Sequence, residues 1–161
     1  MAPQIQTPKG SGIGFVVVQA VLLGILFFGP SHLNSDAGIV TSNGLLLWLG
    51  YGTFILGTVI ALMAAINLGK NLTPLPRPKE NAVLIQVGLY RFVRHPIYFG
   101  VIVLSIGWGL IQQSTLVWMY VLIIAIFFDI KSRKEEQWLV ERFSAYVNYQ
   151  GRVRKLIPWV Y

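Results

Sequence analysis

Residues 45–68 read LLLWLGYGTFILGTVIALMAAINL, a run of 24 residues without a charged side chain. At about 1.5 Å per residue a helix of this length is about 36 Å long, and the hydrocarbon core of a bilayer is about 30 Å thick. The run therefore predicts a transmembrane helix. Within it Gly57, Ala61 and Ala65 recur every four residues, a spacing typical of close packing between membrane helices.

Three further apolar runs predict membrane spans at about 13–29, 96–112 and 115–131. The last two runs are short for a bilayer, and the polar residues 112–114 (QQS) form a tight turn between them. We therefore expect these two to form a short helical hairpin. The first run ends without a small-residue cleavage site, so a retained helix is expected rather than a signal peptide.

The composition of the whole chain agrees with a membrane protein. Of its 161 residues 55% are hydrophobic and 12% are charged, with a mean hydropathy of +0.62. This excludes a disordered chain and disfavours a soluble domain, whose surface needs more polar side chains. Because there is no cysteine, disulfides, thiolate metal sites and cysteine nucleophiles are excluded.

The basic residues predict the topology. The net charge is +7, and twelve of the 13 Lys and Arg residues lie in 70–94 and 131–155, while Lys9 precedes the first span. Four spans place all of them on one side of the membrane, which the positive-inside rule assigns to the cytoplasm. We therefore expect a multi-pass protein of the plasma or inner membrane with both termini in the cytoplasm. Since no nucleic-acid-binding motif is present, the charge does not indicate nucleic acid as a partner.

The loop between the second and third spans carries the first group of candidate site residues. Residues 73–78 (TPLPRP) favour an extended path, because proline prevents a continuous helix. Farther on, Pro96 suits the first turn of a helix, so Arg94 and His95 should lie beside that helix's N-terminus. Unpaired N–H groups and a cation at one place can bind a carboxylate.

The segment after the fourth span carries the second group. Glu135 and Glu136 are adjacent and therefore about 100° apart on a helix, so both cannot face one pocket squarely. Asp129 and Arg133 have the i,i+4 spacing of an ion pair. Apolar residues then recur at helical spacing between Trp138 and Val147, which predicts an amphipathic helix lying along the membrane interface.

Two of these stretches resemble a known family. Residues 88–100, GLYRFVRHPIYFG, closely resemble the signature of the isoprenylcysteine carboxyl methyltransferase family, whose Arg-His-Pro-x-Tyr-x-Gly core the related phospholipid methyltransferases share. Residues 68–74, LGKNLTP, and 135–149, EEQWLVERFSAYVNY, are also similar to that family. The resemblance covers about residues 68–158. One departure is Ser144, where many relatives have glycine.

The resemblance implies an all-α integral membrane protein with about four transmembrane helices, including the short hairpin, and a C-terminal interfacial amphipathic helix. Residues 1–161 would form a single membrane methyltransferase domain, with cofactor-site segments at 83–100 and 131–155. The implied cofactor is S-adenosylmethionine, with no metal. The expected cofactor-binding residues are Gly88, Tyr90, Arg94, His95, Tyr98, Gly100, Glu135 and Glu136.

Side-chain chemistry fits that cofactor and leaves the methyl acceptor open. A glutamate suits the cofactor's ammonium or ribose, and an arginine suits its carboxylate. A carboxylate acceptor is already ionised near neutral pH, so it needs no general base, and a cation such as Arg152 or Arg154 could orient it. Arg152 and Glu136 are therefore the candidate catalytic residues.

The expected function is transfer of a methyl group to a lipophilic, prenylated or lipid acceptor in the bilayer, by resemblance a prenylcysteine carboxylate. N-methylation of a phospholipid amine and S-methylation of a thiol stay open, because relatives of this type methylate all three classes. An NADPH-dependent membrane reductase and a non-catalytic membrane protein are the further alternatives.

Overall fold

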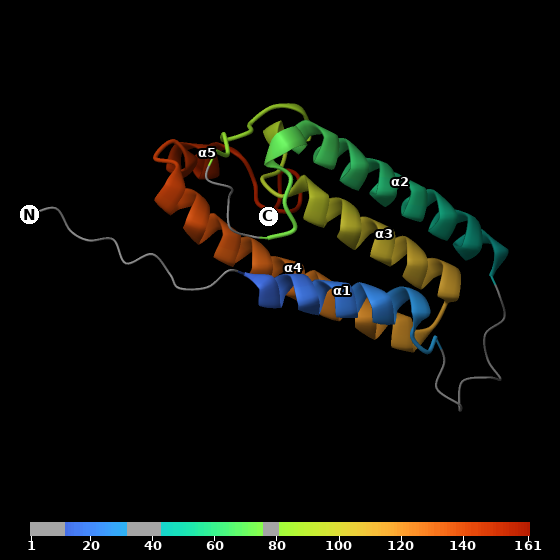
Figure 1. Cartoon of the computed structure of the whole chain (residues 1–161). Helices are drawn as coiled ribbons and strands as arrows, with labels where there is room; N and C mark the ends of the chain where they lie inside the picture. Colours follow the sequence, from blue (N-terminus) through green and yellow to red (C-terminus); the bar gives the residue numbers. More distant parts are fainter. Residues whose placement is uncertain (1–11, 32–42, 76–80) are drawn as a thin grey trace, which may run out of the picture.

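The computed structural model of the chain describes residues 12–31, 43–75 and 81–161, and in these ranges every regular element is a helix. Four long helices run along one another (Figure 1). They are α1 (Ile13–Phe28), α2 (Gly44–Leu68), α3 (Pro96–Gln112) and α4 (Thr115–Arg142). Lys9, Arg77, Lys79 and the prolines at 76 and 78, which entered the sequence predictions, lie outside the described residues.

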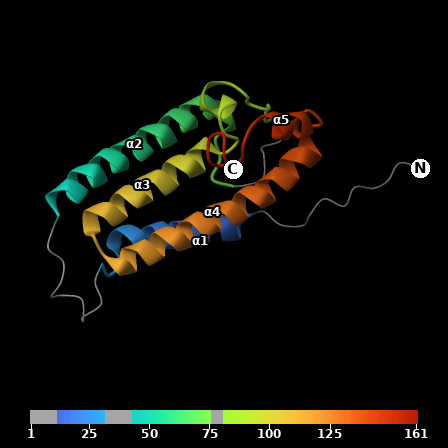
Figure 2. The same cartoon turned by 180° about the vertical axis from the view of Figure 1, so that it is seen from behind.

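The helices alternate in direction, so that the loops gather at two ends of the bundle. Viewed from either side, α2 lies beside α3 and α1 lies beside α4 (Figures 1 and 2). At one end Gln113 bridges to Asn43, donating from its side-chain amide and accepting from the backbone N–H, and Ser114 donates its hydroxyl to the carbonyl of Ser31. At the other end lie residues 81–95, the short helix α5 (Tyr146–Arg152) and the C-terminal residues.

Close packing of α2 on α3 depends on glycine at several crossing points. A Cβ atom built on Gly57 would overlap the backbone nitrogen of Leu104, and one on Gly100 would lie 2.6 Å from the backbone nitrogen of Ala61. The predicted stripe of small residues on α2 thus does face another helix. Gly107 of α3 belongs to the same contact, because a Cβ atom on it would overlap the backbone of Phe54 in α2. Small residues let two membrane helices approach until their backbones touch.

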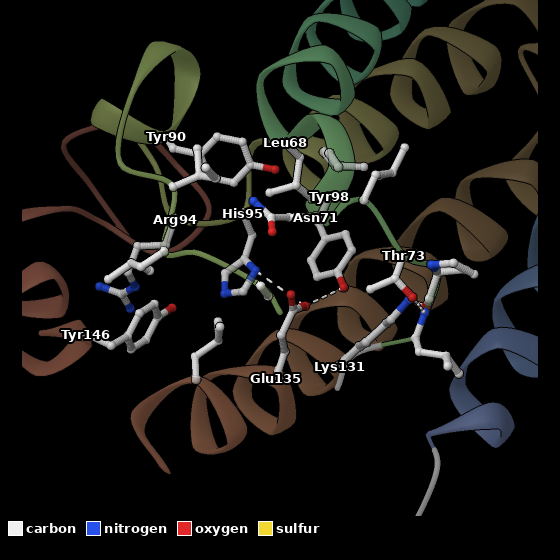
Figure 3. Close-up of a pocket in the computed structure, with 18 of the residues that line it drawn as sticks. Leu68, Asn71, Thr73, Tyr90, Arg94, His95, Tyr98, Lys131, Glu135 and Tyr146 are labelled. Atoms are coloured by element: carbon white, nitrogen blue, oxygen red, sulfur yellow. Dashed lines mark hydrogen bonds and ion pairs between the residues drawn. The ribbon is translucent and has the colours of Figure 1, made fainter. Parts of the chain in front are cut away.

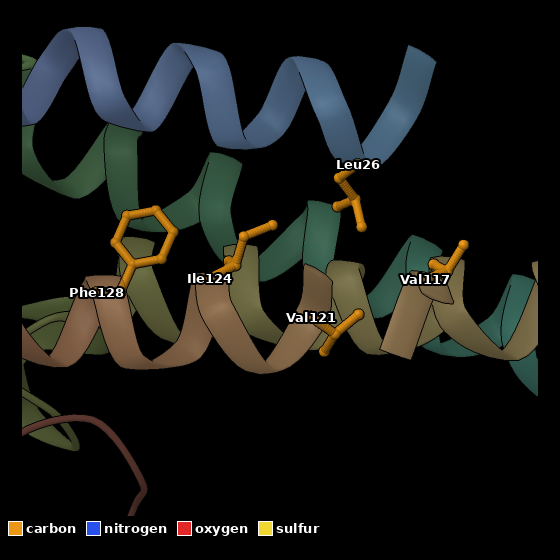
Figure 4. Close-up of a cluster of buried hydrophobic side chains, with 5 residues drawn as sticks. All are labelled: Leu26, Val117, Val121, Ile124 and Phe128. Atoms are coloured by element: carbon orange, nitrogen blue, oxygen red, sulfur yellow. The ribbon is translucent and has the colours of Figure 1, made fainter. Parts of the chain in front are cut away.

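A second contact joins α1 to α4 through buried apolar side chains. Leu26 of α1 packs with Val117, Val121, Ile124 and Phe128 of α4, each no more than 5% exposed (Figure 4). The four α4 residues are spaced three or four apart, which places them on one side of the helix. Between helices that lie in lipid, such a contact stabilises the fold through van der Waals packing rather than through removal of apolar surface from water.

Helix α4 is longer than the sequence predicts. The predicted span ended near residue 131, followed by a separate interfacial helix, but α4 continues to Arg142 and breaks at Phe143. The reason lies in residues 131–142 (KSRKEEQWLVER), which contain no glycine or proline and consist largely of strong helix formers. The predicted Asp129–Arg133 pair also forms within the helix, with Nε 2.8 Å from Oδ2. Trp138 therefore belongs to α4, and the separate helix is the seven-residue α5.

The outer faces of these helices are apolar. Two helical stretches, Gly44–Asn71 and Thr115–Arg142, are long and apolar enough to cross a membrane, and α1 and α3 are shorter apolar helices. On α2 alone Trp48, Ile55 and Ile66 are 77%, 61% and 76% exposed. Apolar surface this extensive is unusual for a soluble monomer and is what lipid requires of a spanning helix.

Candidate functional site

The backbone turn that precedes α3 depends on Gly88. This residue has φ +61°, a conformation that L side chains rarely adopt, and a Cβ atom on it would overlap the side chain of Asn67. The carboxamide oxygen of Asn67 accepts a hydrogen bond of 3.0 Å from the backbone N–H of Leu89. Asn67, in the last turn of α2, thereby fixes the start of the short 3-10 helix η2 (Gly88–Arg91).

The C-terminal segment holds the next few residues in place. The backbone N–H of Arg94 donates to the carbonyl of Arg154 at 2.8 Å, and that of His95 donates to the carbonyl of Lys155 at 3.1 Å. Lys155 is 6% exposed and its ammonium pairs with Asp129 of α4. Residues 93–95 are therefore tied through the C-terminal segment to α4.

A cavity of about 360 Å³ lies at this end of the bundle (Figure 3). That volume is within the usual range for a small-molecule site, about 300–1,000 Å³. It is bounded by the end of α2, residues 71–75 and 82–85, the start of α3, the polar part of α4, and α5. Its polar side chains include Gln19, Asn71, Thr73, Tyr90, Arg94, His95, Tyr98, Lys131, Glu135, Tyr146 and Tyr149. Within the described ranges no three His, Cys, Asp or Glu residues are grouped as metal ligands would be.

Arg94 lines the cavity, but most of its N–H groups are already bonded within the protein. Its Nε lies 2.7 Å from Oε1 of Glu136, and its Nη2 lies 3.3 Å from Oε2 of the same carboxylate. Its Nη1 donates to the carbonyls of Gln150 at 3.0 Å and Val153 at 2.5 Å. A guanidinium has five N–H donors, and these contacts use four of them.

Glu135 and Glu136 make different contacts, as their spacing on the helix requires. Oε2 of Glu135 accepts a hydrogen bond of 2.5 Å from the hydroxyl of Tyr98 and lies 3.7 Å from Nδ1 of His95. Oε1 of Glu136 lies 3.1 Å from Nε2 of His95. The rings of His95 and Tyr98 stack in parallel, with centroids 5.3 Å apart. Glu135 is thus the glutamate that lines the cavity, and Glu136 fixes Arg94 and His95.

Lys131, one helical turn before Glu135, is buried at the cavity wall and 2% exposed. Its ammonium donates to the side-chain oxygen of Gln19 at 2.5 Å and to the carbonyl of Pro74 at 3.3 Å. It also lies 5.2 Å from the centre of the Tyr98 ring. A cationic nitrogen therefore lines the same cavity as the Glu135 carboxylate.

Three tyrosine hydroxyls of the cavity wall stay protonated. Burial raises the pKa of Tyr146 well above its ordinary value, and the charge of Glu136 raises it further. Burial likewise raises the pKa of Tyr149 and of Tyr90. The Tyr149 hydroxyl donates to the carbonyl of Tyr90 at 2.5 Å. These groups act as hydrogen-bond donors across the physiological pH range.

The structure brings together most of the side chains that the sequence singled out. Tyr90, Arg94, His95, Tyr98 and Glu135 line the cavity, with Glu136 bonded to two of them.

Three other candidate residues lie elsewhere. Gly88 packs on Asn67, and Gly100 packs on α2. Arg152 is exposed, donating to the carbonyl of Asn148 at 3.4 Å and to the side chain of Gln86 at 3.5 Å.

Lys131 and Gln19 are polar residues of the cavity wall to which sequence reasoning gave no role. Lys131 was counted among the basic residues that set topology, although its i,i+4 spacing to Glu135 could have placed it on the same face of α4. Gln19, a polar residue inside the first apolar run, was not singled out either. A polar side chain in a membrane span faces the interior of the bundle by default, so its position carried a signal.

A family model described as phospholipid methyltransferase matches residues 45–146. The Saccharomyces cerevisiae protein-S-isoprenylcysteine O-methyltransferase is 31% identical over 116 residues, which are 70% of this chain and 48% of that protein. The Arabidopsis thaliana protein-S-isoprenylcysteine O-methyltransferase B is 30% identical over 115 residues, 69% of this chain and 58% of that protein. Methanethiol S-methyltransferase 1 of Bradyrhizobium diazoefficiens is 40% identical over 93 residues, 57% of this chain and 30% of that protein.

The fold has a solved counterpart. The structure of a eukaryotic intramembrane Ras methyltransferase, isoprenylcysteine carboxyl methyltransferase, matches 97% of this chain and 55% of that one, with a TM-score of 0.69 and 26% sequence identity. The chain spans about half the length of the curated relatives it matches. The resemblance seen in residues 88–100 and 135–149 is confirmed by these matches, which agree in sequence and in fold. This chain belongs to the phospholipid methyltransferase family.

Proposed function

We propose that the chain is an integral membrane methyltransferase that uses S-adenosylmethionine to methylate the carboxylate of a lipophilic, prenylcysteine-type acceptor. The observation that carries the proposal is the cavity at one end of the apolar helices, whose wall combines Glu135, His95 and Tyr98. These residues come from the two stretches that resemble the methyltransferase signature. The similarity to isoprenylcysteine methyltransferases supports the same chemistry.

The side chains of the cavity fit the polar groups of this cofactor. Glu135 can accept hydrogen bonds from an ammonium or from ribose hydroxyls, and the protonated Tyr90 and Tyr146 can donate to a carboxylate. The faces of Tyr90 and Tyr98 can pack against an adenine or lie near a sulfonium. Apolar side chains such as Leu68 and Leu139 complete the wall. The donor set and the volume therefore suit a molecule that is charged at one end and aromatic at the other.

The protein's contribution to the reaction is positioning and exclusion of water. S-adenosylmethionine, when bound, supplies a sulfonium-linked methyl group, so that a new bond to the acceptor oxygen forms as the carbon–sulfur bond breaks and its electron pair stays on sulfur. Glu136 and Arg94 orient His95, and His95 in turn stacks on Tyr98 beside Glu135. Holding two reactants in line in a dry site can account for much of the rate enhancement. Since a carboxylate acceptor is ionised near pH 7, no side chain has to remove a proton.

The proposal includes the topology expected from the sequence. Helices α1 to α4 would each cross the bilayer, and α5 would lie at its surface near the cavity. All Lys and Arg residues would then lie on the cytoplasmic side, together with the cofactor site. The apolar outer faces of α2 and α4 support contact with lipid. Tagging of the two ends, followed by protease accessibility in sealed vesicles, tests this orientation.

A second candidate function is S-methylation of a thiol. The observation in its favour is the 40% identity to a methanethiol S-methyltransferase, a higher identity than to the isoprenylcysteine enzymes given above, though over a shorter stretch. Even a cysteine thiol, whose ordinary pKa is about 8.5, is largely protonated at neutral pH, and so is a simple alkanethiol. Methylation of a thiol would therefore use a base near the acceptor. His95 and Glu135 are the groups of the cavity wall that could accept the proton.

One experiment with the purified full chain in lipid nanodiscs separates these functions. Calorimetry should show binding of S-adenosylmethionine, and a labelled methyl group should then be transferred to N-acetyl-S-farnesylcysteine. Phosphatidylethanolamine and methanethiol are the competing acceptors. Preferred turnover of either one would replace the proposed acceptor, and the absence of any cofactor binding would overturn methyltransferase activity. Stabilisation by NADPH instead would point to a membrane reductase.

A further inference from the structure

Residues 156–161 form a turn with large apolar side chains on its surface. Trp159 is 82% exposed, Val160 is 73% exposed and Ile157 is 47% exposed. The structure describes all of residues 156–161, and none of them lines the cavity. A group of large apolar side chains at a surface marks a place of contact with lipid or with another protein. The turn therefore has an apolar partner outside the described residues.

The main chain of this turn satisfies most of its own hydrogen bonds. The N–H groups of Leu156 and Ile157 both donate to the main-chain oxygen of Tyr161, each at 2.7 Å. Those of Val160 and Tyr161 donate to the carbonyl of Ile157, at 3.2 Å and 3.0 Å. Pro158 has no N–H group. Since lipid offers the backbone no hydrogen-bond partner, a segment that enters it has to pair its polar groups internally. This turn meets that requirement.

Contacts with α4 fix the depth of the turn relative to the apolar helices. The hydroxyl of Tyr161 donates to Oδ1 of Asp129 at 3.0 Å and lies 3.0 Å from the ammonium of Lys155. Asp129 is the first charged residue after the apolar run of α4. Ile126 and Ile130, on either side of it in sequence, are each 52% exposed. The turn therefore lies beside the end of the apolar outer face of α4.

The start of α3 gives the same depth independently. The backbone N–H of His95 donates to the carbonyl of Lys155 at 3.1 Å, and α3 begins at Pro96 and continues into the uncharged run 97–111. The end of the chain lies between α3 and α4, at the end of the bundle that holds the cavity (Figures 1 and 2). The turn is therefore level with the points at which two apolar helices meet the polar end of the bundle.

We propose that residues 156–161 are a membrane anchor, which inserts into the headgroup region of the bilayer with Trp159 and Val160 reaching the acyl chains. Tryptophan suits this depth because its indole has an apolar body and one N–H donor. Arg133, which is 66% exposed and donates to the hydroxyl of Tyr161 at 3.2 Å, is a cation beside the turn that suits lipid phosphates. The inference goes beyond the proposed reaction, because it requires a bilayer and no particular activity.

The test measures which reagents reach the turn in a membrane. Because the natural chain has no cysteine, Trp159→Cys and Val160→Cys each give one labelling site for a nitroxide. Power-saturation spectra of the full chain in lipid nanodiscs then compare collisions with oxygen, which concentrates in lipid, and with a water-soluble nickel complex. Both labels should be more accessible to oxygen than to nickel. The two variants are independent, so Val160→Cys keeps the test decisive if Trp159→Cys does not fold.

Two positions of α4 serve as matched controls in the same nanodiscs. Ile126→Cys, on the apolar outer face, should be reached mainly by oxygen, whereas Glu141→Cys, at an exposed position in the last turn of the helix, should be reached mainly by nickel. The labels at 159 and 160 should report a depth between these two. A depth close to that of Ile126 would support the anchor as well.

Three outcomes would overturn the inference. Labels at 159 and 160 that nickel reaches as readily as it reaches the label at Glu141 would show that the turn is in water. Labels shielded from both reagents would show that protein covers the turn, either a second copy of the chain or another partner. Nickel access at Ile126 would contradict the proposed membrane topology itself, and the anchor with it.

Discussion

Arg94 and Glu136, separated by 42 residues in sequence, form a two-point ion pair in which Nε lies 2.7 Å from Oε1 and Nη2 lies 3.3 Å from Oε2. Both side chains are 12% exposed. The same carboxylate accepts a hydrogen bond of 3.2 Å from the Gln150 side chain and lies 3.1 Å from His95. One carboxylate of α4 therefore holds the start of α3 and the end of α5 together.

We expect Glu136→Ala to lower the free energy of unfolding by about 3–5 kcal/mol, because it leaves the guanidinium of Arg94 buried without its partner. Thermal or denaturant unfolding in detergent measures the change. Arg133→Gln is the control: its ion pair with Asp129 is on the surface, and Arg133 is 66% exposed, so its loss should change stability little. Equal effects of the two substitutions would show that the Arg94 pair is no more important than a surface contact.

Glu135 should act on binding rather than on stability. It contacts Tyr98 and lines the cavity, and its side chain is 25% exposed. We expect Glu135→Gln to weaken S-adenosylmethionine binding about 10–100-fold, the loss of a charged hydrogen bond of about 1.5–3 kcal/mol, with little change in the unfolding temperature. Calorimetry measures the affinity. Glu141→Gln, an exposed position of the same helix, should bind like the wild type, and a similar loss there would contradict a local role for Glu135.

The sequence predicted the helices better than it predicted their ends. Runs of apolar residues and Pro96 placed α3 at its observed bounds, because an apolar helix is encoded by its local sequence. The end of α4 was missed because Lys131 was interpreted as the residue at which the helix leaves the bilayer. In the structure Lys131 is buried inside a helix that continues, and its ammonium is held by hydrogen bonds to Gln19 and Pro74, which are distant in sequence.

The candidate site was partly predictable from the local geometry of a helix. The approximately 100° between adjacent helical residues required Glu135 and Glu136 to differ in role, and the structure shows which one lines the cavity. The role of Arg94 was not predictable, because its partners include the backbone carbonyls of Gln150 and Val153, 56 and 59 residues away. Every residue has a backbone carbonyl, so no pattern in the sequence indicates which carbonyls accept hydrogen bonds from a given side chain.

The contact between α2 and α3 predicts a sharp difference between two glycines of one helix. A Cβ atom on Gly57 would overlap the backbone of Leu104, whereas one on Gly52 would meet no heavy atom of the described chain within 4 Å. Gly57→Ala should therefore destabilise the protein by about 1–3 kcal/mol, as overpacking does. Gly52→Ala should leave stability unchanged or raise it. Unfolding in detergent compares the two, and equal stability would mean that α2 and α3 are not in contact at Gly57.

The buried tyrosines predict how stability changes at alkaline pH. Burial, and then the charge of Glu136, raise the pKa of Tyr146 above its ordinary value of 10.0. Above pH 10 the unfolded chain releases this proton while the folded chain retains it, so folding stability falls as the pH rises; below pH 10 the group has no such effect. The unfolding temperature of Tyr146→Phe should therefore decrease less between pH 9 and pH 11 than that of the wild type. Tyr51→Phe, at a position that is 50% exposed, should decrease like the wild type, and identical pH profiles for all three proteins would show that the Tyr146 hydroxyl is not held protonated by the fold.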